Sequence, residues 1–543
     1  MAVARVACRA QVGLSAPQVQ VEVSLASGLP AFCIVGLAAP VVRESKERVR
    51  AALIHSGFDF PAGRITVSLS PADLPKEGGR FDLPIALGIL LASGQLRAPA
   101  GNAPGAWTRC EYYGELGLTG ELNSVPGILP AAAQAQRQGV ELIVPHANAA
   151  EACAAAPALA HAAAHLLEVC AHLRGLAPLP LCAHARSGAH DHGAPPPANA
   201  RPDLTDVRGQ SLAKRALIIA AAGAHSLLMI GPPGSGKSML AQRLPDLLPA
   251  LSHDEALEVA AIAAVSAAGF DPARLGERPF RTPHHTASAA ALVGGGTRAR
   301  PGEVSLAHHG VLFLDELPEF SRAVLEALRE PLEAGVVSVA RSALQVQYPA
   351  AFQLIAAMNP CPCGRLGEHA GGCKCSSPVV QRYRGRVSGP LLDRLDLHVE
   401  MPPVPAAQFD APSGEETSSR TAAAAVTEAR GIQRARQGVC NARLADADVP
   451  RWCTPDATGR RLLATAVERF GLSARSRTRL LKVARTIADL ERVPHVGAAQ
   501  VSEAMMLRCL DRTGREPALP ERAVAESRRA LTAPSAPCDR RPL

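Results

Sequence analysis

Aromatic residues are scarce in this 543-residue chain, which contains two tryptophans, four tyrosines and eleven phenylalanines. A protein that binds single-stranded nucleic acid mainly by stacking bases needs a richer supply of them. Long apolar runs are absent too. The longest, from Ala216 to Gly231, is interrupted by His225 and is shorter than the roughly 20 residues that span a bilayer. The sequence therefore argues against extensive base stacking and against a membrane partner.

The chain also lacks the pattern of a secretory signal. Its first residues, MAVARVACRAQVG, show no charged region followed by an apolar run and a cleavage site. We therefore expect a cytoplasmic protein whose 14 cysteines are reduced rather than paired in disulfides. The length predicts three or four domains, and a composition of 47% hydrophobic and 20% charged residues is typical of globular ones.

The positive charge is concentrated near the C-terminus. The whole chain carries a formal charge of +8, but residues 420–543 alone contain 23 lysines and arginines against 13 aspartates and glutamates. A positive surface there would attract a polyanion such as DNA. An arginine-rich helical face exposed to solvent explains the same excess, so charge alone leaves both interpretations open.

Residues 1–182 read as a compact α+β unit. Alternating apolar residues predict strands near 19–23 and 64–69, and apolar residues at helical spacing predict a helix over 40–56. An alanine-rich stretch near 147–173 predicts a second helix.

The rest of the chain changes pattern twice. Residues 203–403 alternate strands, turns and helices, which predicts an α/β fold with a parallel sheet and flanking helices. Residues 419–512 are mostly helical. Polar stretches at 183–202 and 404–418 are predicted linkers, and the Pro-, Ala- and Arg-rich residues 513–543 a disordered tail.

The clearest chemical signal follows the apolar run Leu227–Ile230. It is a G-x-x-x-x-G-K-S pattern between a predicted strand and a predicted helix, the context in which backbone N–H groups bind phosphates. Lys237 is expected to reach the β- and γ-phosphates, and the Ser238 hydroxyl to ligate Mg²⁺. The residues predicted to bind nucleotide are Gly231, Pro232, Pro233, Gly234, Ser235, Gly236, Lys237 and Ser238.

Two further apolar strands end in polar residues. Val311–Leu314 ends at Asp315 and Glu316, where the Asp is placed to hold Mg²⁺ and the Glu to polarise an attacking water. Residues 353–358 end at Asn359, which either orients that water or is an ordinary turn residue before a proline.

In this order the phosphate loop, VLFLDE and AAMNP resemble Walker A, Walker B and sensor 1 of AAA+ ATPases. DVRGQ resembles the motif beside the adenine, which implies contacts from Val207 and Gly209. Longer stretches resemble the YifB/ComM group of magnesium-chelatase-like AAA+ proteins over about residues 1–512. They are FRTPHHTAS (280–288), GEVSLAHHGVLFLDELPEF (302–320), AAMNPCPCG (356–364), SGPLLDRLDLHVE (388–400) and GLSARSRTRLLKVARTIADL (471–490).

That resemblance implies a helical lid over 419–512 and two arginines that complete the ATP site. Arg394 matches the arginine finger, which reaches the ATP of a neighbouring subunit, and Arg475 matches sensor 2 on the lid. Hydrolysis would then depend on a homo-hexameric ring. Residues 282–296 resemble the helix-2 insertion of this branch, and residues 332–349 its pre-sensor hairpin.

The N-terminal unit resembles the Lon-protease fold, notably over residues 68–92 and 114–132. Arg80 stands where such proteases have the nucleophilic serine, and Leu129 where they have the general-base lysine. Peptide hydrolysis of that kind needs both groups. We therefore expect a binding or assembly module and not a protease.

Four cysteines lie within fifteen residues, as Cys361, Cys363, Cys373 and Cys375 in a glycine-rich insertion. Clustered thiolates are typical of a structural Zn²⁺ site, although C-x-C is not the usual C-x-x-C spacing. Free thiols on a flexible loop are the alternative.

Three functions remain open for the ring. The resemblance points first to an ATP-dependent helicase that moves branched or single-stranded DNA during natural transformation or recombination, and the basic C-terminal region agrees. The alternatives are a protein-remodelling ATPase and the motor subunit of a magnesium chelatase.

Overall fold

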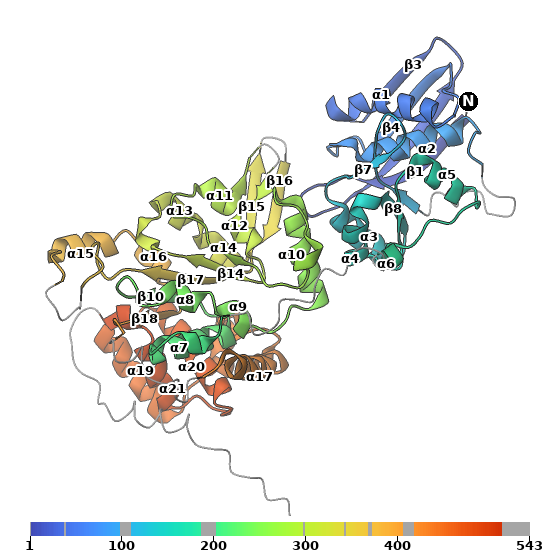
Figure 1. The fold of residues 1–543 in the computed structure, drawn as a ribbon. Helices are drawn as coiled ribbons and strands as arrows, with labels where there is room; N and C mark the ends of the chain where they lie inside the picture. The colour runs from blue at the N-terminus through green and yellow to red at the C-terminus, as the bar shows by residue number, and fades with distance from the viewer. Residues whose placement is uncertain are drawn as a thin grey trace, which may run out of the picture.

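The computed structural model describes residues 2–36, 40–97, 110–185, 202–296, 299–341, 344–366, 372–404 and 417–512 (Figure 1). The predicted tail and most of both predicted linkers lie outside these ranges, although a short helix, α6 (Cys182–Ala185), occupies the start of the first linker. Within the described ranges the chain forms an N-terminal α+β unit, a central unit around a parallel sheet, and a helical C-terminal unit.

The N-terminal unit is built on a mixed seven-stranded sheet in the order β3-β4-β2-β1-β5-β8-β9. Every second residue of β2 and β4 is buried, which is why the predicted strands form here. The strands are β1 (Ala2–Arg9), β2 (Gln18–Ala26), β3 (Ala31–Val35), β4 (Arg64–Ser70), β5 (Cys110–Tyr112), β8 (Glu141–Pro145) and β9 (Ala160–Ala163), with a small hairpin of β6 (Glu115–Leu116) and β7 (Leu122–Asn123).

The helices of this unit confirm one prediction and correct another. The helix predicted over 40–56 is α1 (Pro40–His55). The long helix predicted near 147–173 was wrong in extent, because β9 separates α4 (Ala149–Ala155) from α5 (Leu166–Leu173). Pro157 opposes a continuous helix, and pairing with β8 adds the segment to the sheet. The other helices are α2 (Asp82–Ala92) and α3 (Ile128–Gln138).

The central unit has five parallel strands in the order β11-β14-β17-β10-β18. They are β10 (Leu227–Ile230), β11 (Phe280–Arg281), β14 (Val311–Leu314), β17 (Gln353–Met358) and β18 (Leu397–Glu400). β10, β14 and β17 are buried throughout, because helices cover both faces of the sheet. Parallel strands end at a common edge. Residues 231–238, 315–316 and 359–361 therefore share what we call the carboxyl edge, and residues 224–226, 309–310, 351–352 and 394–396 the opposite amino edge.

Neighbouring residues of β10 point to different layers. Leu227 and Met229 join a core with α7 (Ser211–Gly223) and the C-terminal helices. Leu228 and Ile230 pack on the other face of the sheet, toward α11 (Ala289–Val293), α12 (Glu303–Leu306) and α13 (Arg322–Ala327). The remaining helices are α8 (Lys237–Ala241), α9 (Leu244–Leu247), α10 (His253–Val265), α14 (Arg329–Ala334), α15 (Ser377–Arg384) and α16 (Gly389–Leu392). Two hairpins project from this unit, β12 (Gly294–Gly295) with β13 (Arg300–Pro301) and β15 (Val336–Arg341) with β16 (Leu344–Pro349).

The C-terminal unit consists of α17 (Ser419–Gln437), α18 (Val449–Trp452), α19 (Ala457–Phe470), α20 (Ala474–Leu490) and α21 (Ala498–Met506). It shares a hydrophobic core with α7 and the sheet. A buried polar contact at the amino edge also joins the two units. Asp396 accepts a hydrogen bond of 3.2 Å from the Ser226 amide, lies 3.1 Å from His225 Nδ1, and pairs with Arg479 of α20.

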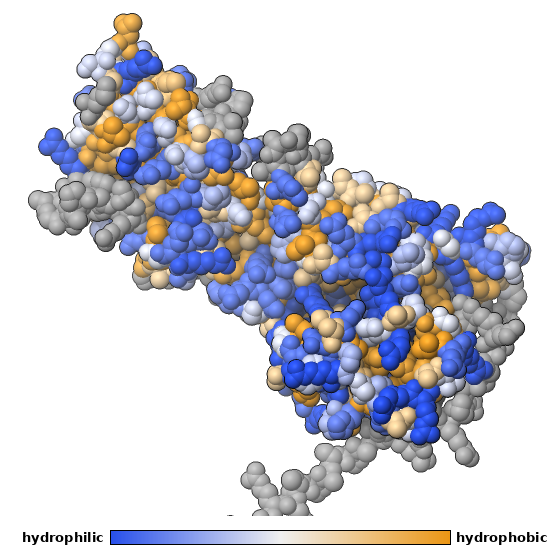
Figure 2. Space-filling model, turned by 180° about the vertical axis from the view of Figure 1, so that it is seen from behind, coloured by the Kyte–Doolittle hydropathy of each residue, from blue (hydrophilic) through white to orange (hydrophobic). Residues whose placement is uncertain are grey.

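The N-terminal unit meets the central unit along α10. Ala260 and Ala264 of this helix belong to the hydrophobic core of the N-terminal unit. From behind, hydrophilic side chains cover much of the central and C-terminal units, with hydrophobic ones scattered among them (Figure 2). Among the described residues, none of the helices combines the length and the apolar character needed to cross a bilayer.

Candidate active site

The predicted phosphate loop joins β10 to α8 at the carboxyl edge. Gly234 and Gly236 have φ values of 78° and 90°, in the left-handed region that favours glycine. A Cβ on Gly231 would lie 2.4 Å from the carbonyl oxygen of Met401. The loop therefore needs glycine at these three positions for reasons of backbone geometry.

Lys237 is buried at the centre of this loop. Its Nζ donates hydrogen bonds to the carbonyl oxygens of Gly231 and Pro232, at 2.7 and 2.8 Å, and reaches Asn359 Oδ1 at 3.3 Å. Burial lowers the pKa of Lys237, although the charges of Asp315 and Glu316 oppose that shift. The ammonium group is thus held by neutral oxygens that a phosphate can replace.

The pair predicted to hold Mg²⁺ is already in contact. Ser238 Oγ donates a hydrogen bond of 2.6 Å to Asp315 Oδ2, and the other oxygen of Asp315 accepts one of 2.9 Å from the Glu316 amide. A serine hydroxyl and a carboxylate are oxygen donors of the kind that Mg²⁺ prefers. The Glu316 carboxylate is separate and more exposed, and its Oε2 lies 3.4 Å from His285 Nδ1.

The cradle around these residues fits a phosphate chain. Ser235 Oγ is buried and has no hydrogen-bond partner within the described ranges, so a polar ligand would satisfy it. Gln210 supports the loop by donating to the carbonyl oxygens of Ser235 and Pro402, at 3.3 and 2.6 Å. A Cβ on Gly236 would lie 3.9 Å from Val207 Cγ1, so Val207 borders the phosphate loop. The contacts of Val207 and Gly209 with adenine stay a prediction.

The two predicted arginines lie elsewhere, beside the same carboxylate. Arg394 Nη2 is 2.7 Å and Arg475 Nη2 is 3.2 Å from Glu333 Oε1. Arg394 is nearly buried and also donates to the Pro390 carbonyl, whereas Arg475 is half exposed. Arg394 precedes β18, so it is at the amino edge, about 13 Å from the carboxyl edge for a strand of four residues. The structure does not bring either arginine to the phosphate loop of the same chain.

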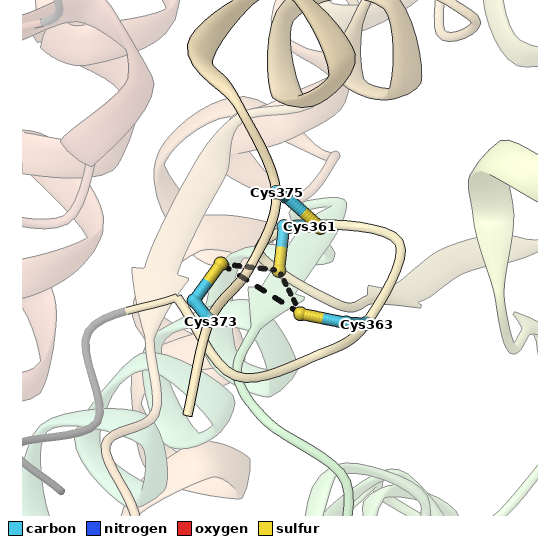
Figure 3. Close-up of side chains that lie close together, drawn as sticks. All are labelled: Cys361, Cys363, Cys373 and Cys375. Atoms are coloured by element: carbon cyan, nitrogen blue, oxygen red, sulfur yellow. Dashed lines mark hydrogen bonds between the residues drawn. The ribbon is translucent and has the colours of Figure 1, made fainter. Parts of the chain in front are cut away.

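The four clustered cysteines converge immediately after Asn359 (Figure 3). All four sulfur atoms lie within 4.8 Å of one another; Cys361 is 3.3 Å from Cys363 and 3.7 Å from Cys373, and Cys363 is 3.7 Å from Cys373. Zn–S bonds of about 2.3 Å in a tetrahedron place sulfurs about 3.8 Å apart. The cluster therefore has the spacing of a four-thiolate zinc site.

This cysteine loop also touches the phosphate loop. A Cβ on Gly364, whose φ is 79°, would lie 2.6 Å from Pro233 Cδ. On the other side, Arg384 of α15 donates to the Pro360 carbonyl at 3.1 Å. The loop that carries the cysteines is thus packed, at Gly364, against Pro233 of the phosphate loop.

In the N-terminal unit, the two positions that hold the nucleophile and the general base in Lon-type proteases are occupied by Arg80 and Leu129. Arg80 is buried, and its guanidinium donates to Gln11 Oε1 at 3.0 Å and to the carbonyl oxygens of Arg9 and Pro126. Leu129 is also buried, at the start of α3. A guanidinium fixed by carbonyls and an aliphatic side chain cannot act as nucleophile and base.

Three family models match successive parts of the chain. The model described as "Magnesium chelatase, subunit ChlI" matches residues 203–409, "Subunit ChlI of Mg-chelatase" matches 21–148, and "Magnesium chelatase, subunit ChlI C-terminal" matches 416–508. These matches cover the central sheet, most of the N-terminal unit and the C-terminal helices.

Two relatives match almost end to end. YifB of Salmonella typhimurium is 46% identical over 513 residues, which cover 94% of this chain and 98% of that protein. Competence protein ComM of Haemophilus influenzae is 45% identical over 515 residues, with the same coverage. The chain belongs to the YifB/ComM family. The 67 kDa magnesium-chelatase subunit of Chlorobaculum parvum is 28% identical over 159 residues, 29% of this chain and 23% of that protein.

Membership of the YifB/ComM family gives the central unit an AAA+ α/β core of the magnesium-chelatase type and suggests an ATPase. The match at 21–148 is to a ChlI model, so the likeness of this unit to Lon proteases stays a prediction.

Several side chains that contact the motif residues could not be assigned a role from the sequence. Glu333, which pairs with both arginines, is one of two acidic residues on α14 and belongs to no sequence motif. His285 lies within the quoted FRTPHHTAS stretch, but its nearness to Glu316 depends on how that segment folds back. Gln210 ends the DVRGQ motif, and the structure shows that its side chain donates a hydrogen bond to the Ser235 carbonyl of the phosphate loop.

Proposed function

We propose that the protein hydrolyses ATP, with Mg²⁺, at the carboxyl edge of the central sheet. The observation that carries this proposal is the direct contact of Lys237 with Asn359 and of Ser238 with Asp315, which unites the ends of three strands in one site. In this proposal Ser238 and Asp315 hold Mg²⁺, which neutralises phosphate charge when bound.

Each remaining residue has one task in the hydrolysis step. Lys237 exchanges its carbonyl partners for β- and γ-phosphate oxygens, where its charge is more favourable. Asn359, beside Lys237, orients the attacking water. The Glu316 carboxylate accepts a proton from that water. His285 Nδ1 lies 3.4 Å from Glu316 Oε2, so the imidazole competes with water for this oxygen.

We infer that the working form is a homo-hexameric ring. Arg394 and Arg475 are at the amino edge, away from the site in their own chain, and they share Glu333. A neighbouring subunit docked on this edge would bring its ATP to both arginines. Each guanidinium would then exchange Glu333 for the γ-phosphate and stabilise charge in the transition state.

The substrate we propose is DNA, branched or single-stranded, moved during natural transformation or recombination. The competence relative and the positive excess of residues 420–543 support it. With so few aromatic residues, binding would rely on lysine and arginine contacts to phosphates. Affinity for DNA should then fall steeply with salt, and a flat salt response would contradict the proposal.

The magnesium-chelatase subunit of Chlorobaculum favours a second candidate, a chelatase motor acting on a porphyrin. A protein-remodelling ATPase is the third. ATP turnover measured with duplex DNA, a forked DNA, an unfolded polypeptide or a porphyrin separates the three. We expect the forked DNA to stimulate ATP turnover most. Stimulation of turnover by the polypeptide alone, or by the porphyrin alone, would replace the DNA proposal.

The two accessory regions have structural roles in this proposal. The N-terminal unit, which we take to be Lon-like, serves in binding or assembly and not in proteolysis, because Arg80 and Leu129 replace the reacting groups. The cysteine cluster holds a structural Zn²⁺ that stiffens the loop behind Pro233.

A further inference from the structure

Apart from the nucleotide site, a polar cavity lies at the amino edge, between the sheet and the C-terminal helices. Its volume is about 190 Å³. Arg278, which precedes β11, and Gln353, the first residue of β17, line it from the sheet side. Arg430 and Arg434 of α17 and Arg443, which follows α17, line it from the lid. It is therefore separate from the nucleotide loop, which is at the opposite edge.

The cavity carries an excess of positive charge. Four arginines line it, against the single carboxylate of Glu255. That carboxylate is partly engaged, since its Oε2 accepts the Ser252 amide in the capping box of α10, and Arg434 Nη2 approaches its other oxygen only to 3.9 Å. Like charges one helical turn apart, as in Arg430 and Arg434, repel each other.

The bonds that these arginines make do not neutralise them. Arg430, 7% exposed, donates Nε and Nη2 to the Ala221 carbonyl. Arg278 donates to the carbonyls of Pro249 and His309. Arg443 forms no side-chain hydrogen bond or ion pair with any residue that the structure describes. Burial and the charge of Arg430 lower the pKa of Arg278 to about 10, as expected of a cation without a full counter-charge.

We propose that this cavity binds a small phosphate-bearing anion, of the size of diphosphate. Guanidinium groups match phosphate oxygens in geometry, and each one here retains N–H groups that carbonyls do not use. At about 30 Å³ per water, the cavity has room for about six waters, which suits one or two phosphate groups. The bound anion would link α17 to the sheet and remove the repulsion among the four arginines.

The test uses the full-length Lys237→Ala protein, so that the nucleotide loop does not contribute phosphate binding. Inorganic diphosphate is titrated by calorimetry into this protein, and into the same protein carrying Arg434→Ala and Arg443→Ala. Arg460→Ala, a substitution of an exposed arginine on α19 outside the cavity, is the matched control. Both substituted cavity residues are exposed, so we expect the variants to fold.

We expect diphosphate to bind to Lys237→Ala and to raise its thermal midpoint. The double substitution should weaken binding at least about tenfold, since each charge-assisted hydrogen bond contributes substantially, and Arg460→Ala should leave binding unchanged. Absence of binding at millimolar diphosphate would overturn the proposal, and so would an affinity for diphosphate that the double substitution leaves unchanged. Displacement of diphosphate by a short DNA duplex, with the same dependence on Arg434 and Arg443, would assign the cavity to the DNA backbone and overturn the small-anion ligand.

Discussion

The Arg394 guanidinium and the Glu333 carboxylate form a 2.7 Å ion pair at the edge of the sheet opposite the phosphate loop. Glu333 also lies 3.2 Å from Arg475, so one carboxylate holds two cations that no described nucleotide-loop residue contacts. If both arginines serve ATP, the ATP belongs to a neighbouring subunit. In the ring that we propose, this relationship would make assembly a condition for hydrolysis.

Substituting Arg394 with alanine should separate binding from turnover. We expect ATP affinity within about twofold of the unmodified protein, because Lys237 and the loop are untouched. Turnover should fall by about 10³-fold or more if Arg394 acts as an arginine finger. Turnover is also measured after mixing with Glu316→Gln subunits, which supply an intact Arg394 to a neighbour with an intact Glu316. Partial recovery is expected, and a failure of every mixing ratio would point to a purely structural Arg394.

Replacing Lys237 by alanine should remove nucleotide binding itself. The ammonium group is the only lysine charge that the described structure places in the loop, and its contacts are with oxygens that ATP would displace. We expect ATP affinity, measured with a fluorescent analogue, to fall at least about 100-fold. Arg460→Ala on the exposed surface of α19 is the control. Retained affinity in Lys237→Ala would move the nucleotide to another site.

The purified protein should contain about one zinc per chain. Cys363→Ser removes one of four ligands and should lower the zinc content, while Cys33→Ser, outside the cluster, should not. Because Gly364 packs on Pro233, removal of zinc should also reduce ATP turnover with Mg²⁺ in excess. Zinc far below one per chain in the unmodified protein would leave the four cysteines as free thiols.

Buried His308 predicts a loss of stability in mild acid. Burial, together with the neighbouring His309, lowers its pKa to about 4 from an ordinary value near 6.5, against the attraction of Glu258. The folded state therefore binds fewer protons than the unfolded one between these values, so stability should fall as the pH drops from about 6.5 to about 4. The contribution is about 1–3 kcal/mol.

Unfolding by urea across this pH range checks the prediction. His308→Asn keeps an acceptor for the Ala351 amide, which donates to His308 Nδ1 at 2.9 Å, and removes the titrating group. The slope of stability against pH should be smaller in the variant. An unchanged slope would assign the acid sensitivity to other groups.

The motifs could be predicted because each of them occupies one continuous stretch. Gly231 to Ser238, Asp315 and Asn359 follow apolar strands, and the parallel order of β10, β14 and β17 brings these strand ends together. Nothing in the sequence pairs Glu333 with Arg394, or brings Arg278 and Arg430 to one cavity, because both arrangements depend on packing between distant elements.

Local propensity also misled where tertiary pairing outweighed it. The alanine content of the segment near 147–173 favours helix, yet Ala160–Ala163, just after Pro157, adds an edge strand to the sheet. The charge excess after residue 420 left open a polyanion partner and a solvated helical face, and only the structure shows that Arg430, Arg434 and Arg443 line one cavity with Arg278.

The most direct test of the account is displacement of a labelled strand from a three-strand DNA branch by the purified protein with ATP, run beside Glu316→Gln. The variant should still bind ATP and DNA but lack the base that activates water. We expect ATP-dependent displacement by the unmodified protein and none by the variant. Vigorous ATP hydrolysis without displacement of any branched DNA, or equal displacement by Glu316→Gln, would contradict it.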